Sequence, residues 1–488
     1  MEIFCPGSFC GKNIVVTETR KITEKECQKF FAQFNFLELA REICKLSLKL
    51  FLSEKIENFG GVPFNDRTLC EALSLSIKYA NNEKLVAPSE ESLKEVVRIA
   101  LSEEEQELLK HSDALEMMTR IAYDQFHESP IHVLSRAWCL FTDAWPSSNT
   151  IKPLEEIEMT VGLSYKSVLY FTLASFADGY VFPYKQLSEL SSFFGEYLKE
   201  DAHQQFLNYF SSTKADWLKK TIPPIYVSKP ILNSGEVPDG KESVVYFVPS
   251  VNYLLARVTT GIYHDISDRY SRGTGENLFR VEFGYAFEKY VGMLLEFYLK
   301  SFEISKEIVY GKQQKKTVDY FLKKDKELVL VEVKQSGIFA NAKYLGDHHC
   351  ALNDLKKNVG KAIKQIRTTQ NLIKNGQAEL SAYKECSVVH NLIVVNDRLY
   401  NANSICKDLL KPEHGDLSDI SFINISELES LLEIQDENQD LLEILKNKVE
   451  HFPSYDFNEL WSHEYKERTD GARFLRKYYG QIFPERES

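Results

Sequence analysis

The feature that most constrains this chain is an apolar run that ends in two charged residues. In the segment Thr317–Gly337, a polar turn at Lys323–Lys326 separates two predicted strands, and the second strand begins with the run Leu328–Val331. Both faces of that run are apolar, so the strand is expected to be central and buried. Side chains alternate between the faces of a strand, so Glu332 and Lys334 should point the same way. Two buried charges on one face are costly unless they have partners.

The residues around this segment predict an α/β domain. Apolar residues at three- and four-residue spacing predict helices, and short β-branched runs between polar turns predict strands. The order is helix, three strands, helix, two strands and helix, which is typical of a central mixed sheet flanked by helices. The helices are expected at Asn277–Lys300, Asp347–Ile373 and Ser426–Ile434, and the strands at Ile304–Tyr310, Thr317–Leu322, Glu327–Val333, Val388–Val395 and Ile420–Ile425.

The rest of the chain predicts a multidomain protein, and 488 residues are enough for several cores. Helical spacing dominates the N-terminal half, so residues 1–220 are expected to form a mostly α-helical domain that regulates or binds a partner. Prolines and glycines between short β-branched runs predict a strand-rich connector over 221–275, which ends in a loop at Asp265–Gly275. The α/β domain then covers 276–434, and a helical C-terminal extension covers 435–488.

Charge is distributed unevenly along the chain. The net charge of -12 argues against a protein that coats nucleic acid with its whole surface, but lysines exceed acids in the stretch Lys312–Lys374. The nine cysteines are scattered, the N-terminal residues do not resemble a secretory signal, and no apolar run is long enough to span a membrane. We therefore expect a cytoplasmic protein without a membrane segment.

The charged residues of the predicted hairpin fit metal-assisted hydrolysis of a phosphodiester. Asp319 lies in the first strand and Glu332 in the second, so their carboxylates could hold a hard divalent cation. Mg²⁺ is such a cation, because it binds carboxylate and phosphate oxygens, and Mn²⁺ is a substitute. The cation polarises the phosphate and lowers the pKa of water. The ammonium of Lys334 can orient the attacking water and stabilise developing negative charge.

This pattern resembles the PD-(D/E)XK, or restriction-endonuclease-like, nuclease superfamily. The matching residues are Val318-Asp319 and Glu332-Val333-Lys334, where Val318 stands in place of the proline of the signature. The resemblance covers residues 276–434, roughly a third of the chain. It implies a restriction-endonuclease-like fold, an Mg²⁺-dependent endonuclease, and products with a 5′-phosphate and a 3′-hydroxyl.

Two helices add candidate site residues. Glu288 shares a stripe of the first helix with apolar residues such as Val291, and the resemblance implies that it completes the metal site. Members of the superfamily often carry a Gln or a basic residue in the helix after the motif, which implies an active-site role for Gln365. The alternatives are a surface charge at the edge of the stripe for Glu288 and a polar helix face for Gln365.

Lysines near the motif are candidates for a nucleic-acid surface, because clustered ammonium groups hold a polyanion by releasing its counterions. The alternative is ordinary solvation of a helix and two turns. The candidates are Lys315, Lys316, Lys343, Lys357 and Lys361.

The sequence thus predicts a metal-dependent nuclease, acting on DNA rather than RNA, that is controlled by its helical half or by a protein partner. Oligomerisation is left open. Nucleases fused to large helical modules are frequent in bacterial anti-phage defence, which suggests that setting. Two other classes of function remain: a catalytically silent nucleic-acid clamp and a protein-interaction scaffold. In a further alternative, Asp319, Glu332 and Lys334 form an ordinary ion-paired, solvent-facing hairpin.

Overall fold

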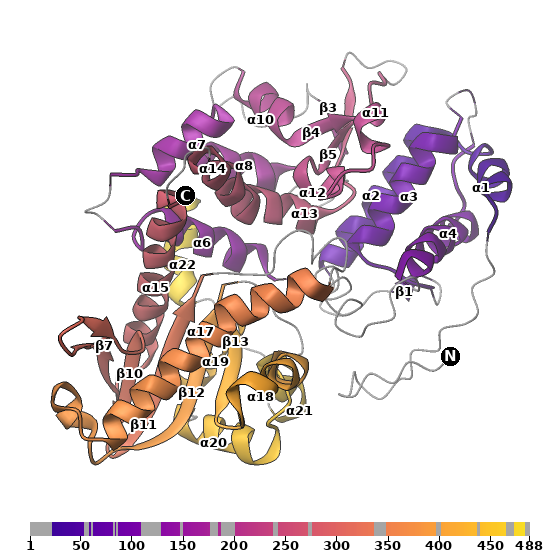
Figure 1. Ribbon diagram of the computed structural model, residues 1–488. Helices are drawn as coiled ribbons and strands as arrows, with labels where there is room; N and C mark the ends of the chain where they lie inside the picture. The colour runs from indigo at the N-terminus through magenta and orange to yellow at the C-terminus, as the bar shows by residue number, and fades with distance from the viewer. Residues whose placement is uncertain are drawn as a thin grey trace. The chain divides into compact units, whose positions relative to one another are not determined.

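The chain forms two compact units (Figure 1). Unit 1 comprises Met1–Met117, Ile121–His127 and Leu154–Ile266, and unit 2 comprises Met118–Arg120, Glu128–Pro153 and Ser267–Ser488. The computed structural model describes residues 22–52, 58–59, 62–81, 83, 86–108, 128–146, 150–175, 184–186, 201–237, 243–271, 276–335, 348–396, 402–436, 440–464 and 473–483.

Unit 1 is mostly helical, as the apolar spacing predicts. Its main core lies between the first helices, where Phe31, Leu39, Leu69 and Val96 are fully buried. Capping boxes begin two of these helices, because Thr23 and Asn65 accept hydrogen bonds from the main-chain N–H three residues on. The described helices that lie wholly or mainly in unit 1 are α1 (Glu24–Phe31), α2 (Phe36–Leu52), α3 (Asp66–Tyr79), α4 (Glu90–Leu108), α7 (Pro153–Val161), α8 (Tyr165–Ala174), α10 (Ala202–Phe210), α11 (Lys214–Trp217), α12 (Ile225–Ser228), α13 (Val251–Ala256), the π-helix η1 (Arg257–Gly261) and α14 (Ile262–Tyr270).

The described residues of unit 1 also form two small sheets. One pairs β1 (Asn58–Phe59) with β2 (Val62–Pro63). The other has the order β3-β6-β5-β4, with β3 at Tyr184–Gln186, β4 at Ser211–Thr213, β5 at Ile231–Asn233 and β6 at Val245–Phe247. The strands of the predicted connector therefore pair with earlier parts of the chain.

The expectation of a loop at Asp265–Gly275 is wrong as far as Tyr270, because α14 continues to that residue. The polar character that suggested a loop has another cause. Asp265 accepts a hydrogen bond from Arg257 Nη2 at 2.5 Å, so a polar residue pairs with a buried guanidinium inside helical structure. Residues 272–275 lie outside the described part of the chain.

Unit 2 is built on a five-stranded mixed sheet with the order β13-β12-β11-β10-β7. Strands β11, β12 and β13 are parallel, whereas β10 is antiparallel to both β11 and β7. The bounds are β7 (Glu303–Lys306), β10 (Tyr320–Lys324), β11 (Glu327–Lys334), β12 (Ser387–Val395) and β13 (Ile420–Asn424). The strand expected at Ile304–Tyr310 is divided, because β8 (Val309–Tyr310) pairs with β9 (Lys315–Lys316) in a separate ribbon.

The long helix α17 (His348–Lys374) lies across one face of this sheet (Figure 1). Its apolar residues, including Ala362 and Ile363, pack with Phe321 and Leu330 in one core. Neighbouring residues of a strand point to opposite faces. Tyr320 accordingly leaves that core and reaches α15 (Leu278–Tyr298), where its hydroxyl donates to Glu288 O at 2.9 Å.

Gly292 allows α15 to approach the sheet closely. A Cβ atom at this position would lie 2.4 Å from the hydroxyl oxygen of Tyr320, which is shorter than real Cβ contacts. The missing side chain therefore lets Tyr320 reach the main chain of the helix. This contact holds the turn of α15 that carries Glu288 against β10.

The C-terminal residues and Glu128–Pro153 pack into unit 2. The buried guanidinium of Arg136, on α6 (Pro130–Phe141), pairs with Glu429 at 2.7 Å, and Glu429 also accepts a hydrogen bond from Tyr290 at 2.6 Å. These contacts join three parts of unit 2 that are distant in the sequence, because Arg136 lies on α6, Tyr290 on α15 and Glu429 in the C-terminal part of the chain. The remaining helices are the 3₁₀ helix η2 (Ala378–Tyr383), the π-helix η3 (Ala402–Cys406), α18 (Lys407–His414), α19 (Ile425–Asp436), α20 (Leu441–His451), α21 (Phe457–Glu464) and α22 (Arg473–Ile482).

Candidate active site

Asp319 lies one residue before β10 and is 8% exposed. The register pairs Tyr320 with Val331, and continuing it by one residue brings Asp319 opposite Glu332. Asp319 Oδ2 accepts a hydrogen bond from the main-chain N–H of Val333 at 2.7 Å. Burial raises the pKa of Asp319, while Lys334 and this hydrogen bond act in the opposite direction. A buried carboxylate that needs these partners does not belong to a solvent-facing hairpin.

Glu332 is the most deeply buried acid of the candidate site, with an exposed fraction of 0%. Burial and the nearby charge of Asp319 raise the pKa of Glu332 to about 8, even though Lys334 favours the ionised form. Its Oε1 atom is paired with Lys334, whereas its Oε2 atom is buried without a hydrogen-bond partner in the described structure. One oxygen of this carboxylate therefore remains available for a cation or a proton.

Lys334 ends β11, and its ammonium pairs with Glu332 Oε1. This contact confirms that the two side chains share a face of the strand, as their spacing predicts. The side chain of Lys334 is 24% exposed, so its ammonium lies between the buried carboxylate and solvent. It could contact a substrate at that position.

Glu288 lies on α15 and is partly buried. Burial raises the pKa of Glu288 to about 7, and the charges of Asp319 and Glu307 contribute to this rise. The charge of Asp319 thus acts on both Glu288 and Glu332. The hydrogen bond from Tyr320 to the main-chain oxygen of Glu288 holds this turn of α15 beside the residue that follows Asp319.

Gln365 contacts the backbone that leads to Asp319 and makes no hydrogen bond to a carboxylate among the bonds the structure describes. Its Nε2 atom donates to Thr317 O at 2.6 Å, and Thr369 Oγ1 accepts a hydrogen bond from Val318 N at 3.1 Å. These two side chains of α17 form hydrogen bonds with main-chain groups that would otherwise pair with a neighbouring strand. This explains why β10 begins at Tyr320 rather than at Thr317. Gln365 is therefore placed as a positioning residue.

Glu307 is a further acid near the site, and no pattern in the sequence singles it out. It lies between β7 and β8, its charge raises the pKa of both Asp319 and Glu288, and its Oε1 atom is 2.6 Å from Lys316 Nζ. A lone acid in a short charged turn gives no periodic signal. The pairing of β7 with β10 matches Tyr320 with Lys306, and continuing that register by one residue brings Glu307 opposite Asp319.

The described residues contain no group of three or more His, Cys, Asp and Glu side chains that could hold a metal ion. Mg²⁺ does not require such a cage, because proteins usually bind it through one or two carboxylates together with water and substrate phosphates. Asp319 and Glu332 supply hard oxygen donors, and Glu332 Oε2 is buried without a hydrogen-bond partner. Burial of an ionised oxygen without a partner is costly. The donor set therefore fits a hard divalent cation.

The candidate nucleic-acid lysines fall into two groups. Lys315 and Lys316 are exposed on β9, where Lys316 pairs with Glu307. Lys357 and Lys361 are exposed one turn apart on α17 and form no ion pair within the described chain. Lys343 lies outside the described residues. The structure thus places one pair of lysines on the β8–β9 ribbon and another on the helix that covers the sheet.

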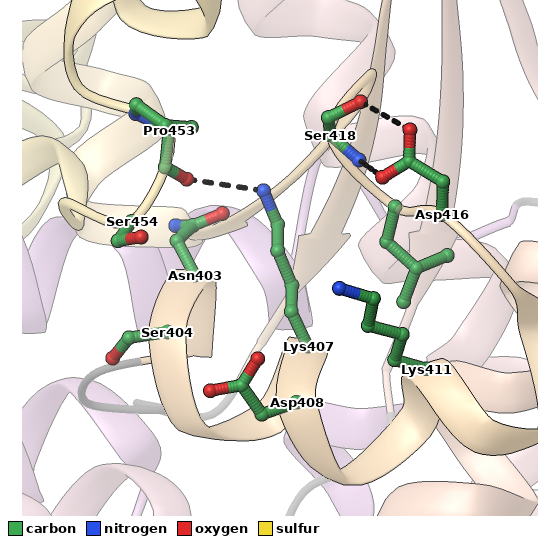
Figure 2. A pocket seen from close by; sticks show the side chains of 10 residues that line it. Asn403, Ser404, Lys407, Asp408, Lys411, Asp416, Ser418, Pro453 and Ser454 are labelled. Carbon is green, nitrogen blue, oxygen red and sulfur yellow. Dashed lines mark hydrogen bonds between the residues drawn. The ribbon is translucent and has the colours of Figure 1, made fainter.

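A hollow of about 140 Å³ lies elsewhere in unit 2, beside η3 and α18 (Figure 2). Within it, the buried Lys407 donates to Pro453 O at 3.2 Å, and burial lowers the pKa of Lys407 to about 8. Asp416 accepts hydrogen bonds from Ser418 N and Oγ, as Figure 2 shows. Asp416 and Ser418 precede β13, whereas Lys334 ends the parallel strand β11. The hollow therefore lies near the N-terminal ends of these parallel strands, whereas the candidate site lies at their C-terminal ends. None of the candidate site residues lines the hollow.

Comparison of the chain with protein-family models, with curated proteins and with solved structures finds no match. Among the described helices, none combines the length and apolar character needed to cross a membrane. Any assignment of function therefore has to stand on the geometry of the residues themselves.

Proposed function

We propose that this protein is a metal-dependent nuclease that hydrolyses nucleic-acid phosphodiester bonds, with DNA favoured over RNA. The observation that carries the proposal is the arrangement of the buried acids Asp319 and Glu332 beside the half-buried Lys334, where the chain enters β10 and leaves β11. Ordinary surface ion pairs contribute little and are solvated. Two buried acids beside a partly exposed lysine at strand ends instead match a site whose partners arrive with the substrate.

Asp319 and Glu332 would hold Mg²⁺, or Mn²⁺ as a substitute, and Glu288 would complete the site. The proposed ion would supply charge neutralisation at the scissile phosphate and would acidify water. Glu288 and Glu332 have pKa values of about 7 and about 8, so each must release a proton before it becomes a full ligand. Ion binding should therefore be coupled to pH.

Lys334 would stabilise negative charge that develops on the phosphate. Its ammonium already faces a carboxylate, and its partial exposure leaves room for a phosphate oxygen to approach. A fixed cation in a poorly solvated site stabilises a transition state more strongly than it would in water. Lys334 would also orient the attacking water toward phosphorus. The expected products carry a 5′-phosphate and a 3′-hydroxyl.

The element order of unit 2 supports a restriction-endonuclease-like fold for the proposed enzyme. A helix precedes an antiparallel hairpin, a second long helix follows it, and two parallel strands complete the sheet. Sheet order alone does not determine function, because one fold can carry many sites. The argument for a nuclease rests on the charged residues that end β11 and precede β10.

The helical half is proposed to control the nuclease, directly or through a protein partner, in the cytoplasm. Anti-phage defence in a bacterium is the setting we propose for such control. The test compares plaque counts in cells that carry the wild-type gene, the Glu332→Ala gene or neither. Equal protection by the wild-type and Glu332→Ala genes would separate defence from cleavage.

The experiment that tests the activity uses the purified full chain with supercoiled plasmid and with end-labelled single strands. Mg²⁺, Mn²⁺ and EDTA are compared, beside Lys334→Ala. Metal-dependent cleavage that Lys334→Ala loses would support the proposal. Equal cleavage by both proteins would reject the site. Binding of nucleic acid without cleavage under any metal would favour a silent clamp, and absence of both would favour a scaffold.

A further inference from the structure

Tyr285 is an exposed aromatic residue at the rim of the candidate site. Its exposed fraction is 52%, and it precedes Glu288 by three residues on α15, so the two side chains are neighbours on the helix surface. The adjacent Gly284 faces the end of β11, since a Cβ atom there would lie 3.7 Å from Gln335 Oε1. Gln335 directly follows Lys334. Tyr285 therefore lies where α15 meets the end of β11 that carries Glu332 and Lys334.

An ammonium group also lies beside the candidate site. Lys316 Nζ is 2.6 Å from Glu307 Oε1, and continuing the register of β7 and β10 by one residue brings Glu307 opposite Asp319. The pKa of Lys316 is raised mainly by its hydrogen bond to Glu307. Lys315 is exposed on the same strand. An aromatic face beside cations is the combination that binds single-stranded nucleic acid, because bases stack on the ring while phosphates are attracted to the ammonium groups.

We infer that Tyr285 stacks against an unpaired base beside the scissile phosphate, and that the substrates of this site are single-stranded or locally unpaired nucleic acids. In a duplex, each base is covered by its stacked neighbours, so a side chain can reach the face of a base only after the strand is opened. This inference rests on the proposed nuclease function and names the substrate class of the same site. Tyr285 acts in binding and takes no part in bond cleavage.

Cleavage kinetics of Tyr285→Ala and Tyr285→Phe test the inference. The substrates are a labelled single strand and a duplex of the same sequence, in Mg²⁺. Tyr285→Ala should raise KM for the single strand roughly 10- to 100-fold, in line with the loss of one base–aromatic stack, and should leave kcat nearly unchanged. Tyr285→Phe keeps the ring and should behave like the wild type. The duplex should be cleaved far more slowly than the single strand by the wild type, and neither variant should change that slow rate by much.

Phe297→Ala provides a matched control, because Phe297 is another exposed aromatic residue of α15, with an exposed fraction of 43%, three turns beyond Tyr285. It should leave KM for both substrates unchanged. The inference is overturned by an unchanged single-strand KM in Tyr285→Ala, or by an equal loss for the duplex. Loss of binding in Tyr285→Phe would also overturn it, since the hydroxyl rather than the ring would then be responsible.

A binding measurement separates this inference from the proposed chemistry. Lys334→Ala is used as the background, and the probe is a single strand that contains 2-aminopurine, whose fluorescence falls when the base stacks. Quenching that disappears with Tyr285→Ala supports stacking, even if the wild-type protein cuts nothing. Cleavage by the wild-type protein without any Tyr285-dependent quenching would preserve the proposed function and reject the stacking role.

Discussion

Asp319 Oδ2 accepts a hydrogen bond from the main-chain N–H of Val333 at 2.7 Å, and this contact ties together the two strands that carry the candidate site. Val333 stands between Glu332 and Lys334, so the contact fixes the carboxylate of Asp319 relative to both. Asp319 thus has a structural role through one oxygen and a proposed chemical role through its charge. Substitutions can separate these roles.

Asp319→Asn should abolish cleavage and leave thermal stability close to that of the wild type. The amide oxygen can still accept the Val333 hydrogen bond, but the negative charge is lost. Asp319→Ala should lose cleavage and also about 1–3 kcal/mol of stability, because it leaves a buried N–H without a partner. Cleavage assays and thermal denaturation of both variants measure this difference. An Asn variant that cuts at the wild-type rate would exclude Asp319 as a charged ligand.

Glu332→Gln should stabilise the protein at alkaline pH while it removes activity. The pKa of Glu332 is raised to about 8, so its contribution to stability is fully present below the pKa of an unfolded glutamate and is lost as pH rises through about 8. The amide of the Glu332→Gln variant does not ionise, so this variant would escape that loss. We expect the stability difference, on the order of a few kcal/mol at most, to grow between about pH 5 and about pH 9.

Thermal denaturation at several pH values, without divalent cations, measures this difference. Glu413→Gln is a suitable control, because Glu413 is an exposed acid paired with Lys356. The Glu413→Gln protein should show no such alkaline gain. A Glu332→Gln protein that follows the wild-type pH profile would show that this carboxyl ionises normally.

Mg²⁺ should stabilise the wild-type protein more at about pH 8.5 than at about pH 6. The pKa values of Glu288 and Glu332 are raised to about 7 and about 8, so at the lower pH a cation has to displace protons from both carboxyls. The measurement is the shift of the thermal midpoint on addition of Mg²⁺ at each pH. The shift should vanish in Glu332→Gln, and a shift that persists there would locate cation binding at another site.

Gln365→Ala should lower kcat while the stabilisation by Mg²⁺ remains. Gln365 holds Thr317 O, two residues before Asp319, and does not contact a carboxylate in the described structure. A small displacement of Asp319 should cost roughly 10-fold in rate, because catalysis is sensitive to the placement of reacting groups. Gln370→Ala is the matched control on α17, since Gln370 contacts Asn391 and Asp419 instead. Equal losses in both variants would indicate general damage to the helix.

Lys357→Ala and Lys361→Ala should each weaken nucleic-acid binding and reduce its dependence on salt. Each lost phosphate contact lowers the slope of log K against log salt by roughly 0.7 to 0.9. Lys356→Ala is the control, because that lysine pairs with Glu413 at 2.5 Å. The Lys334→Ala background prevents cleavage during the titrations. If both variants kept the wild-type slope of log K against log salt, α17 would not be part of the binding surface.

Much of unit 2 was predictable from local patterns. The apolar run Leu328–Val331 predicted a buried strand, and strand alternation predicted that Glu332 and Lys334 share one face; both are found there. The helical stripe that contains Glu288 predicted α15 within two residues at each end. These patterns depend on the periods of single helices and strands, which a sequence carries directly.

The sequence alone thus determined that Glu332 and Lys334 share a face and that Glu288 lies on an apolar helical stripe, because strand and helix periods fix which side chains share a face. Only the tertiary structure decided what surrounds them. Gln365 reaches the main chain of Thr317 across 48 residues of sequence, and the pairing of β7 with β10 brings Glu307 opposite Asp319. Arg136 likewise joins Glu429 over 293 residues. Such contacts depend on the packing of elements that are distant in the chain, and no local period encodes that packing.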